Sequence, residues 1–336
     1  NPPHQSERRR RGRVPVACAR RIGRQADGAR DAWAGVLFGD AGAAAYRAIC
    51  PLFLAADHGW VFGGYNGNYP EAFDASRASP LFERVGFDVV YTESDGANLP
   101  TWRARCRTGI DGGFVHVNSA GYPRWFEVVR RERAWASETP LLREPAIVHF
   151  IHSFSAKIVD HPESISGRWL ENGAYAYVGA VDEPYLQGFL PAEKYFSRLF
   201  AGVPLGAAPR YDDASAWKIQ VVGDPLIVAG RPRPRRAVEP PLPGAEPLEA
   251  IMKRAIEARR FAEGASALIM LGRDDDAIRV TRAALADAPG DADGAGLARA
   301  VILPAFRAGD HELFMDLFER LPPKEASREL YTSALW

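Results

Sequence analysis

The chain has 336 residues, of which 47% are hydrophobic and 25% are charged, an ordinary composition for a globular protein. Its 42 basic and 42 acidic side chains give a formal net charge of zero, which argues against nucleic-acid binding by the chain as a whole. No apolar run approaches the roughly 20 residues that a membrane span requires. The length leaves room for two domains with a sizeable core.

The three cysteines, Cys18, Cys50 and Cys106, are too few and too scattered for a disulfide framework or a C-x-x-C metal site. They are compatible with a reducing compartment, and the cytoplasm is the favoured location. The chain begins at Asn1 rather than at Met, so we treat it as a piece that can lack upstream sequence or a signal peptide.

Residues 1–30 form a basic arm that lacks apolar periodicity. The arm holds nine arginines against Glu7 and Asp27, an excess of seven positive charges, so the remainder of the chain carries minus seven. We predict that it is disordered and favour a solvated arm over a nucleic-acid or targeting patch. Any nucleic-acid binding is expected only here.

Residues 31–230 alternate between strand and helix patterns. In chain order they predict a helix within 33–56, a strand over 59–64, helix 80–85, strand 87–91, helix 99–107, strand 114–117, helix 125–133, strand 146–151, helix 164–171, strand 174–178, helix 185–200 and strand 217–222. This order indicates a three-layer α/β domain with a mainly parallel sheet. The glycine-rich loop after the first strand has no G-x-G-x-x-G or P-loop motif, so no cofactor is predicted.

A linker and a helical tail follow. Residues 231–247 contain six prolines and four arginines, which is typical of an extended spacer between domains. Residues 248–336 then keep a helical period to the end. The tail places small residues and a closing proline at Gly272, Ala277, Ala284 and Pro289, with a looser echo at Gly309, Phe314 and Pro322. The first set resembles the second helix of a tetratricopeptide repeat, so we expect the tail to bind a protein or peptide partner.

The candidate site lies where two buried strands end. His116 is near the end of one strand, and His152 and Ser153 follow the next. If these strands are neighbours, the three side chains meet at the carboxyl edge of the sheet, where parallel sheets place their chemistry. A histidine is a suitable base for an adjacent nucleophile. His116 and His152 could also share a metal, but no third ligand is evident, so no metal is predicted.

Two further features lie close to this site. His149 is three residues from His152 and therefore on the opposite face of its strand, where we interpret it as a hydrogen-bonded core residue. Asp182 and Glu183 follow the strand over 174–178 near the same edge. They are candidates either for substrate binding or for capping the next helix at Pro184.

Several segments together resemble one known family. They are the HVNSAG stretch at His116, the next strand about 35 residues later, the segment GRWLENGAYAYVGAVDEP over 167–184, and the closing strand that ends in GDP at 223–225. In this order they are similar to the catalytic domain of gingipain-type cysteine peptidases, which share the caspase-like fold. The resemblance covers roughly residues 57–228. It implies a histidine at the end of one strand and a nucleophilic cysteine at the end of the next, and acidic groups that select basic side chains.

The residues at these positions match the family only in part. His116 corresponds to the histidine, but His152 stands in place of the cysteine, with Ser153 beside it, and no cysteine follows Cys106. Thiolate attack needs sulfur, and Cys106 falls in a predicted helix as a buried thiol. We therefore expect a degenerate peptidase homologue that acts in protein binding. The alternatives are an active hydrolase that uses Ser153 with His116, or a purely structural scaffold. Asp182 and Glu183 could retain a pocket for Arg or Lys.

Overall fold

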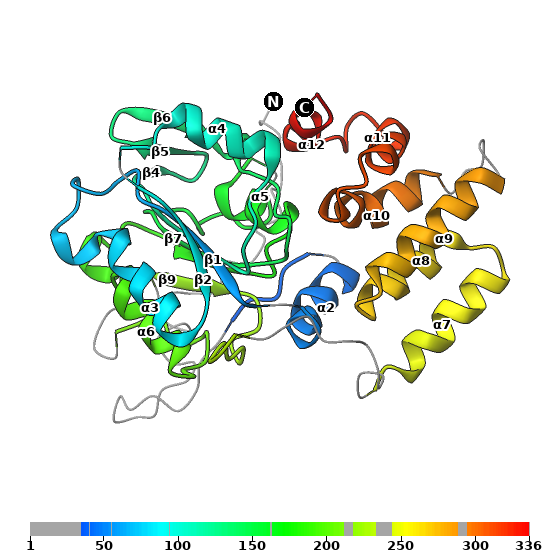
Figure 1. The fold of residues 1–336 in the computed structure, drawn as a ribbon, viewed down its shortest axis with the longest axis horizontal. Helices are drawn as coiled ribbons and strands as arrows, with labels where there is room; N and C mark the ends of the chain where they lie inside the picture. Colours follow the sequence, from blue (N-terminus) through cyan, green and yellow to red (C-terminus); the bar gives the residue numbers. More distant parts are fainter. Residues whose placement is uncertain are drawn as a thin grey trace, which may run out of the picture.

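A computed structural model describes residues 35–39, 41–54, 56–93, 95–161, 163–211, 218–232, 244–287 and 294–335. The basic arm, Pro289 and most of the predicted linker lie outside these residues. The described part consists of an α/β region followed by a helical tail (Figure 1). Among the described helices, none is long and apolar enough to cross a membrane.

A six-stranded sheet forms the centre of the α/β region. Its order is β2 (Asp88–Thr92), β1 (His58–Phe62), β3 (Phe114–Asn118), β7 (Ile147–Ile151), β8 (Ala176–Ala180) and β9 (Ile219–Val222). The first five strands are parallel, and β9 is antiparallel to β8. The predicted mainly parallel sheet is therefore confirmed, and the arrangement is compatible with a caspase-like layout.

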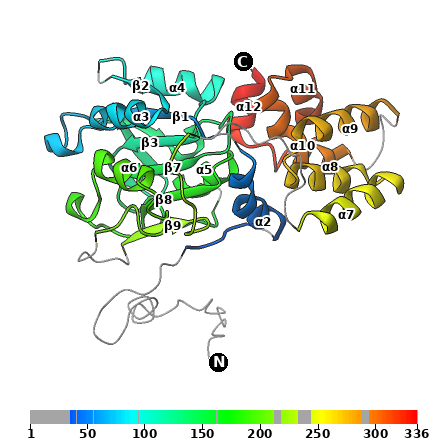
Figure 2. The ribbon, with the colours of Figure 1, turned by 60° about the horizontal axis from the view of Figure 1, so that its bottom comes forward.

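Helices cover both faces of this sheet (Figures 1 and 2). One face packs against α3 (Ser79–Val85) and α6 (Ala192–Phe200), and the other against α4 (Leu99–Thr108) and α5 (Ile165–Glu171). Alternate residues of a strand point to opposite faces, so Phe114 joins the first core and Val115 the second. Both sides of β3 and β7 are buried, which explains why both strands are mainly apolar on both faces.

The predicted helix over 125–133 is wrong. The segment forms a β-hairpin of β5 (Trp125–Val129) and β6 (Glu132–Trp135), which pairs with β4 (Gly121–Tyr122) in a small antiparallel sheet. Phe126 and Val128 are buried while their neighbours are half-buried, a period of two that belongs to a strand. Arg131 turns the chain with a φ of 72°.

The predicted helix over 185–200 begins late. Residues Leu186–Gly188 form a single 3-10 turn, and α6 starts only at Ala192. Pro191 has no N–H to donate and disfavours a helical conformation of the residue before it, and here its own backbone is extended, with a ψ of 149°, directly before α6. Before the sheet, the predicted helix within 33–56 is α2 (Ala41–Ile49) with a 3-10 turn (Cys50–Leu52). The other 3-10 turns are Glu71–Phe73, Ala75–Ala78 and Ala136–Glu138.

All regular secondary structure in the described part of the tail is helical. Its helices are α7 (Glu246–Glu257), α8 (Phe261–Met270), α9 (Asp274–Asp287), α10 (Gly294–Ala308), α11 (His311–Arg320) and α12 (Arg328–Leu335). Gly272 turns between α8 and α9 with a φ of 72°, and Ala277 and Ala284 of α9 are buried. The helical tail is confirmed, while its relation to tetratricopeptide repeats stays a prediction.

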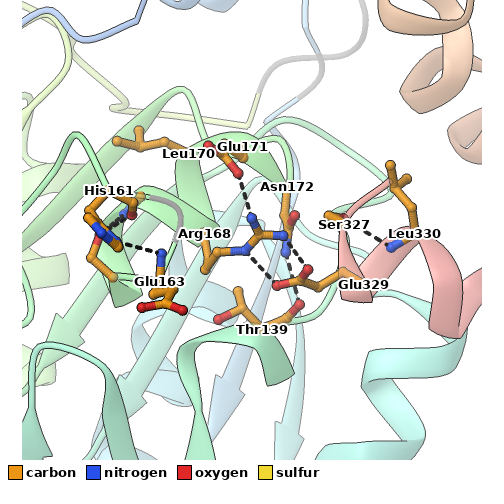
Figure 3. A network of polar contacts seen from close by, with 12 residues as sticks. Thr139, His161, Glu163, Arg168, Leu170, Glu171, Asn172, Ser327, Glu329 and Leu330 are labelled. Atoms are coloured by element: carbon orange, nitrogen blue, oxygen red, sulfur yellow. Dashed lines mark hydrogen bonds and ion pairs between the residues drawn. The ribbon is translucent and has the colours of Figure 1, made fainter. Parts of the chain in front are cut away.

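The tail packs directly against the α/β region. Leu141, which precedes β7, belongs to the hydrophobic core of the tail, and the guanidinium of Arg143 lies 5.4 Å from the ring centre of Phe306 in α10. A buried ion pair joins Arg168 of α5 to Glu329 of α12 (Figure 3). The two parts therefore share a packed interface.

Candidate functional site

The two strands that carry the candidate residues are neighbours, which is the condition that the predicted site required. β3 and β7 pair in parallel with His116 opposite His149 and Asn118 opposite Ile151. Beyond the last pair, the backbone N–H of Ser119 still donates to the carbonyl of Ile151 at 2.9 Å. The carboxyl ends of the two strands therefore reach the same edge of the sheet.

His116 itself lies in the middle of β3, not at its end. Its side chain is fully buried on the α6 side of the sheet, with its ring centre 5.9 Å from that of Phe196. Its Nε2 is 3.0 Å from Asn118 Oδ1, and its Nδ1 is 3.1 Å from Nδ1 of His149. The residue at the strand end is Asn118, so this chain departs here from what the family resemblance implies.

The hydrogen-bond partners determine the tautomers of both histidines. Asn118 Nδ2 donates to the carbonyl of Phe73 at 2.6 Å, which leaves Asn118 Oδ1 as an acceptor for a proton on His116 Nε2. A neutral His116 then has its lone pair on Nδ1, and His149 must donate its Nδ1–H to it. As long as His149 carries its proton on Nδ1, a second proton on His116 would place two N–H groups against each other, so this arrangement suits two neutral rings.

The buried surroundings favour the same neutral state. Burial lowers the pKa of His116 to about 4, although hydrogen bonds to the side chain of Asn118 and to the backbone of His149 oppose that shift. Burial, with the added repulsion from His116, also lowers the pKa of His149 well below its ordinary value. Neither ring is charged at neutral pH.

His152 occupies a different environment. It is 1% exposed, and its ring packs beside Phe150, which belongs to the core on the opposite side of the sheet from His149. Its Nε2 lies 3.3 Å from the carbonyl of Trp125 in the hairpin. Burial lowers the pKa of His152 to about 4. This histidine therefore joins the hairpin to the main sheet.

Ser153 bonds to a carboxylate and not to a histidine. Its Oγ donates to Glu183 Oε1 at 2.8 Å, and the same oxygen accepts the backbone N–H of Tyr185 at 2.9 Å. The carbonyl of Asp182 accepts the N–H of Phe154 at 3.4 Å. Both acidic residues thus help to join the loops after β7 and β8, and the selection of basic side chains by them stays a prediction.

The candidate residues therefore fall into three separate groups. His116 bonds with His149 and Asn118, His152 with the hairpin, and Ser153 with Glu183. Within the described residues, no hydrogen bond joins His116 to His152 or Ser153. Asn118 was missed at the sequence level, although its place two residues after His116 puts both on one face of the strand.

Two other possible sites lie elsewhere. A hollow of about 220 Å³ lies between α5 and the tail, and one of about 410 Å³ is lined by Trp135, Glu163 and Arg328 among others. Neither is lined by His116, His152 or Ser153. Cys50 and Cys106 are both buried, and burial raises the pKa of each thiol, so neither is an activated nucleophile.

Comparisons with known proteins add little to this description. No family model matches the chain, and no curated protein matches it. A solved structure described as "Structure of Protease" matches with a TM-score of 0.35 and 12% identity, over 56% of this chain and 52% of that chain. The chain thus spans about half the length of that structure, and the likeness to a protease-like fold is weak.

Proposed function

We propose that this chain is a gingipain-type peptidase homologue that has lost catalysis and acts in protein binding. The observation that carries the proposal is the closed hydrogen-bond network of His116. A general base needs a free lone pair within reach of the proton that it removes. Here Nδ1 of His116 accepts from His149, and its Nε2 proton is held by Asn118. The ring has no lone pair left for a nucleophile.

The nucleophile position supports the same proposal. No cysteine follows Cys106 anywhere in the sequence, and Ser153 is paired with the Glu183 carboxylate. That pair is the one observation in favour of the alternative, an active hydrolase that uses Ser153. A carboxylate can polarise a hydroxyl, but a serine nucleophile is normally activated by a base that can also return the proton to the leaving group.

We expect no turnover of casein or small peptide amides by the purified chain, and no labelling of Ser153 by a fluorophosphonate probe between about pH 6 and pH 9, the range that brackets a histidine base. Gel electrophoresis and mass spectrometry give the two readouts. The matched variants are His116→Ala and Ser153→Ala. Suppose the wild-type chain shows turnover or labelling, and His116→Ala or Ser153→Ala abolishes it. That result would contradict the loss of catalysis and favour the active hydrolase.

The tail supplies the proposed binding surface. Met315 of α11 is 37% exposed, and Tyr331 and Leu335 of α12 are 55% and 79% exposed. Tyrosine and methionine are enriched at protein interfaces. The tail is therefore the better candidate for partner binding than the buried histidines.

We expect substitutions on this surface to weaken binding at least tenfold, whereas Ser153→Ala leaves it unchanged. Once a partner has been captured with the immobilised chain and purified, its affinity is measured for Met315→Glu, Tyr331→Glu and Ser153→Ala by surface plasmon resonance. Equal affinities for all three variants would show that this surface does not bind the partner. The hypothesis of a purely structural scaffold would then be favoured.

A further inference from the structure

The β5–β6 hairpin has an aromatic outer face. The small sheet of β4, β5 and β6 lies at the margin of the α/β region (Figure 1). On its inner face, Phe126 and Val128 belong to the hydrophobic core. Neighbouring residues of a strand point to opposite faces, and residues that pair directly across two strands share a face. The outer face therefore carries a row of Tyr122, Trp125 and Trp135, one from each strand.

The rings of this row are accessible and held in place. Tyr122 is 58% exposed, and Trp135 is 56% exposed. The ring centres of Tyr122 and Trp125 lie 5.5 Å apart. Phe154, from the loop after β7, stacks on Tyr122 with an angle of 5° between the rings and 5.8 Å between their centres. Phe154 has a φ of 63°, which is rare for a bulky residue, so the loop holds this ring against Tyr122 at a cost in backbone strain.

Two cations lie over the rings. The guanidinium of Arg133 is 4.1 Å from the centre of the Trp125 ring, and the ammonium of Lys157 is 5.0 Å from that of Phe154. Both distances are within the range of a cation–π interaction. A guanidinium is planar and keeps N–H donors for a phosphate while it stacks on a ring. The aromatic face therefore combines flat rings with groups that bind anions.

The hairpin is basic within an otherwise acidic chain. Residues 121–135 hold four arginines against two glutamates, whereas the chain after the basic arm carries minus seven in total. Both glutamates, Glu127 and Glu132, accept hydrogen bonds from the main domain at 2.9 Å. Within the described residues, three of the four arginines, all except Arg124, form no ion pair with a carboxylate. Their charges are available to a ligand.

A hollow lies at the Trp135 end of the row. Its volume is about 410 Å³, and Trp135, Arg124, Glu163 and Arg328 are among the residues that line it. Arg124 pairs with Glu163 at 3.1 Å. Arg328, at the start of α12, forms no ion pair among the residues that the structure describes. An unpaired guanidinium beside an exposed indole suits a ligand that joins an anionic group to a flat ring.

We propose that this outer face binds single-stranded nucleic acid, with bases stacked on Tyr122 and Trp135 and phosphates bound by Arg133 and Arg328. Every base offers a flat face for stacking, and every nucleotide carries a phosphate, so a strand satisfies both the rings and the cations. An acidic peptide would satisfy only the cations. The proposal concerns a local surface and does not depend on the proposed function.

The full chain is titrated into fluorescein-labelled single strands of deoxythymidine or uridine, and anisotropy is measured. Strands of about 20 nucleotides are longer than the site of one small domain. We expect saturable binding that weakens as salt is raised. Tyr122→Ala and Trp135→Ala should each weaken it about 5- to 100-fold, whereas Tyr122→Phe, which keeps the ring, should not. Arg133→Gln should reduce the slope of log affinity against log salt by about 0.7, the value for one phosphate of a single strand.

The matched controls lie in the tail. Tyr331→Ala removes a ring that is 55% exposed, and Arg279→Gln removes an arginine that is 71% exposed. Both should leave the affinity unchanged. A duplex of the same length hides its bases, so any binding of it, by the basic arm for example, should not respond to Tyr122→Ala or Trp135→Ala.

Three results would overturn the proposal. The first is no binding of either strand. The second is an affinity that Tyr122→Ala and Trp135→Ala leave unchanged, because the arm or another charged surface would then hold the strand. The third is full displacement of the strand by polyglutamate at an equal concentration of charge. The surface would then recognise charge alone and would suit an acidic peptide.

Discussion

Replacing Glu329 with alanine lowers the free energy of unfolding by about 3–5 kcal/mol, the usual cost of leaving one partner of a buried ion pair alone. Glu329 is 1% exposed and Arg168 is 6% exposed. Arg168 Nε donates to Glu329 Oε1 at 2.7 Å, and Nη2 bonds to the second carboxylate oxygen (Figure 3). Without the carboxylate, the guanidinium keeps only the contact between Nη1 and the half-exposed Glu171.

Denaturant unfolding of wild-type and variant chains measures this effect. The matched control is Glu325→Ala, which removes the partner of Arg299 in an exposed pair on the same part of the tail and should change stability little. The double variant Arg168→Met with Glu329→Met should recover most of the loss, because no buried charge then remains. Equal destabilisation by Glu329→Ala and Glu325→Ala would contradict the role given to this pair.

Lowering the pH from about 7 to about 5 removes about 2 kcal/mol of stability for His116 and a similar amount for His152. Both rings are buried and neutral, with pKa values lowered to about 4 from the ordinary 6.5. Between these two values the unfolded chain binds protons that the folded chain does not. Unfolding is therefore favoured as the pH falls, and His149, whose pKa is also lowered, acts in the same direction.

The slope of stability against pH tests this prediction. His152→Gln should reduce the loss between pH 7 and pH 5 by about 2 kcal/mol, whatever it does to the stability at neutral pH. The matched control is His311→Gln, which changes an exposed histidine of α11 and leaves His116 and His152 in place, so the loss that comes from these two rings should remain. An unchanged slope in His152→Gln would show that this ring takes up a proton in the folded state.

Local patterns of the sequence were sufficient for much of the α/β region. The run over 146–151 predicted β7, and Ser164 predicted the start of α5, where its Oγ accepts the N–H of Gly167 at 3.2 Å. These features depend on neighbouring residues alone, which is why they can be recognised in isolation. The β7–α5–β8 unit follows from them, whereas the pairing of β3 with β7 was only a condition of the predicted site and comes from the structure.

Local sequence patterns gave the wrong prediction at the β5–β6 hairpin and at the start of α6. The segment over 125–133 has apolar residues at both helical and strand spacing, and pairing with β4 decided the outcome. For α6, the apolar spacing predicts a helix from 185, but Pro191 disfavours a helical conformation of the residue before it, and the helix starts at Ala192.

The sequence by itself determined the α/β layers, most of the strands and helices along the chain, and the absence of a cysteine beyond position 106. The tertiary structure alone decided which groups meet: His116 with His149, and Arg168 with Glu329 across 161 positions. The reason is physical. Periodicity reports which face of an element is buried, whereas hydrogen-bond partners and the state of a histidine depend on side chains that only the packing of distant segments brings within 3–4 Å.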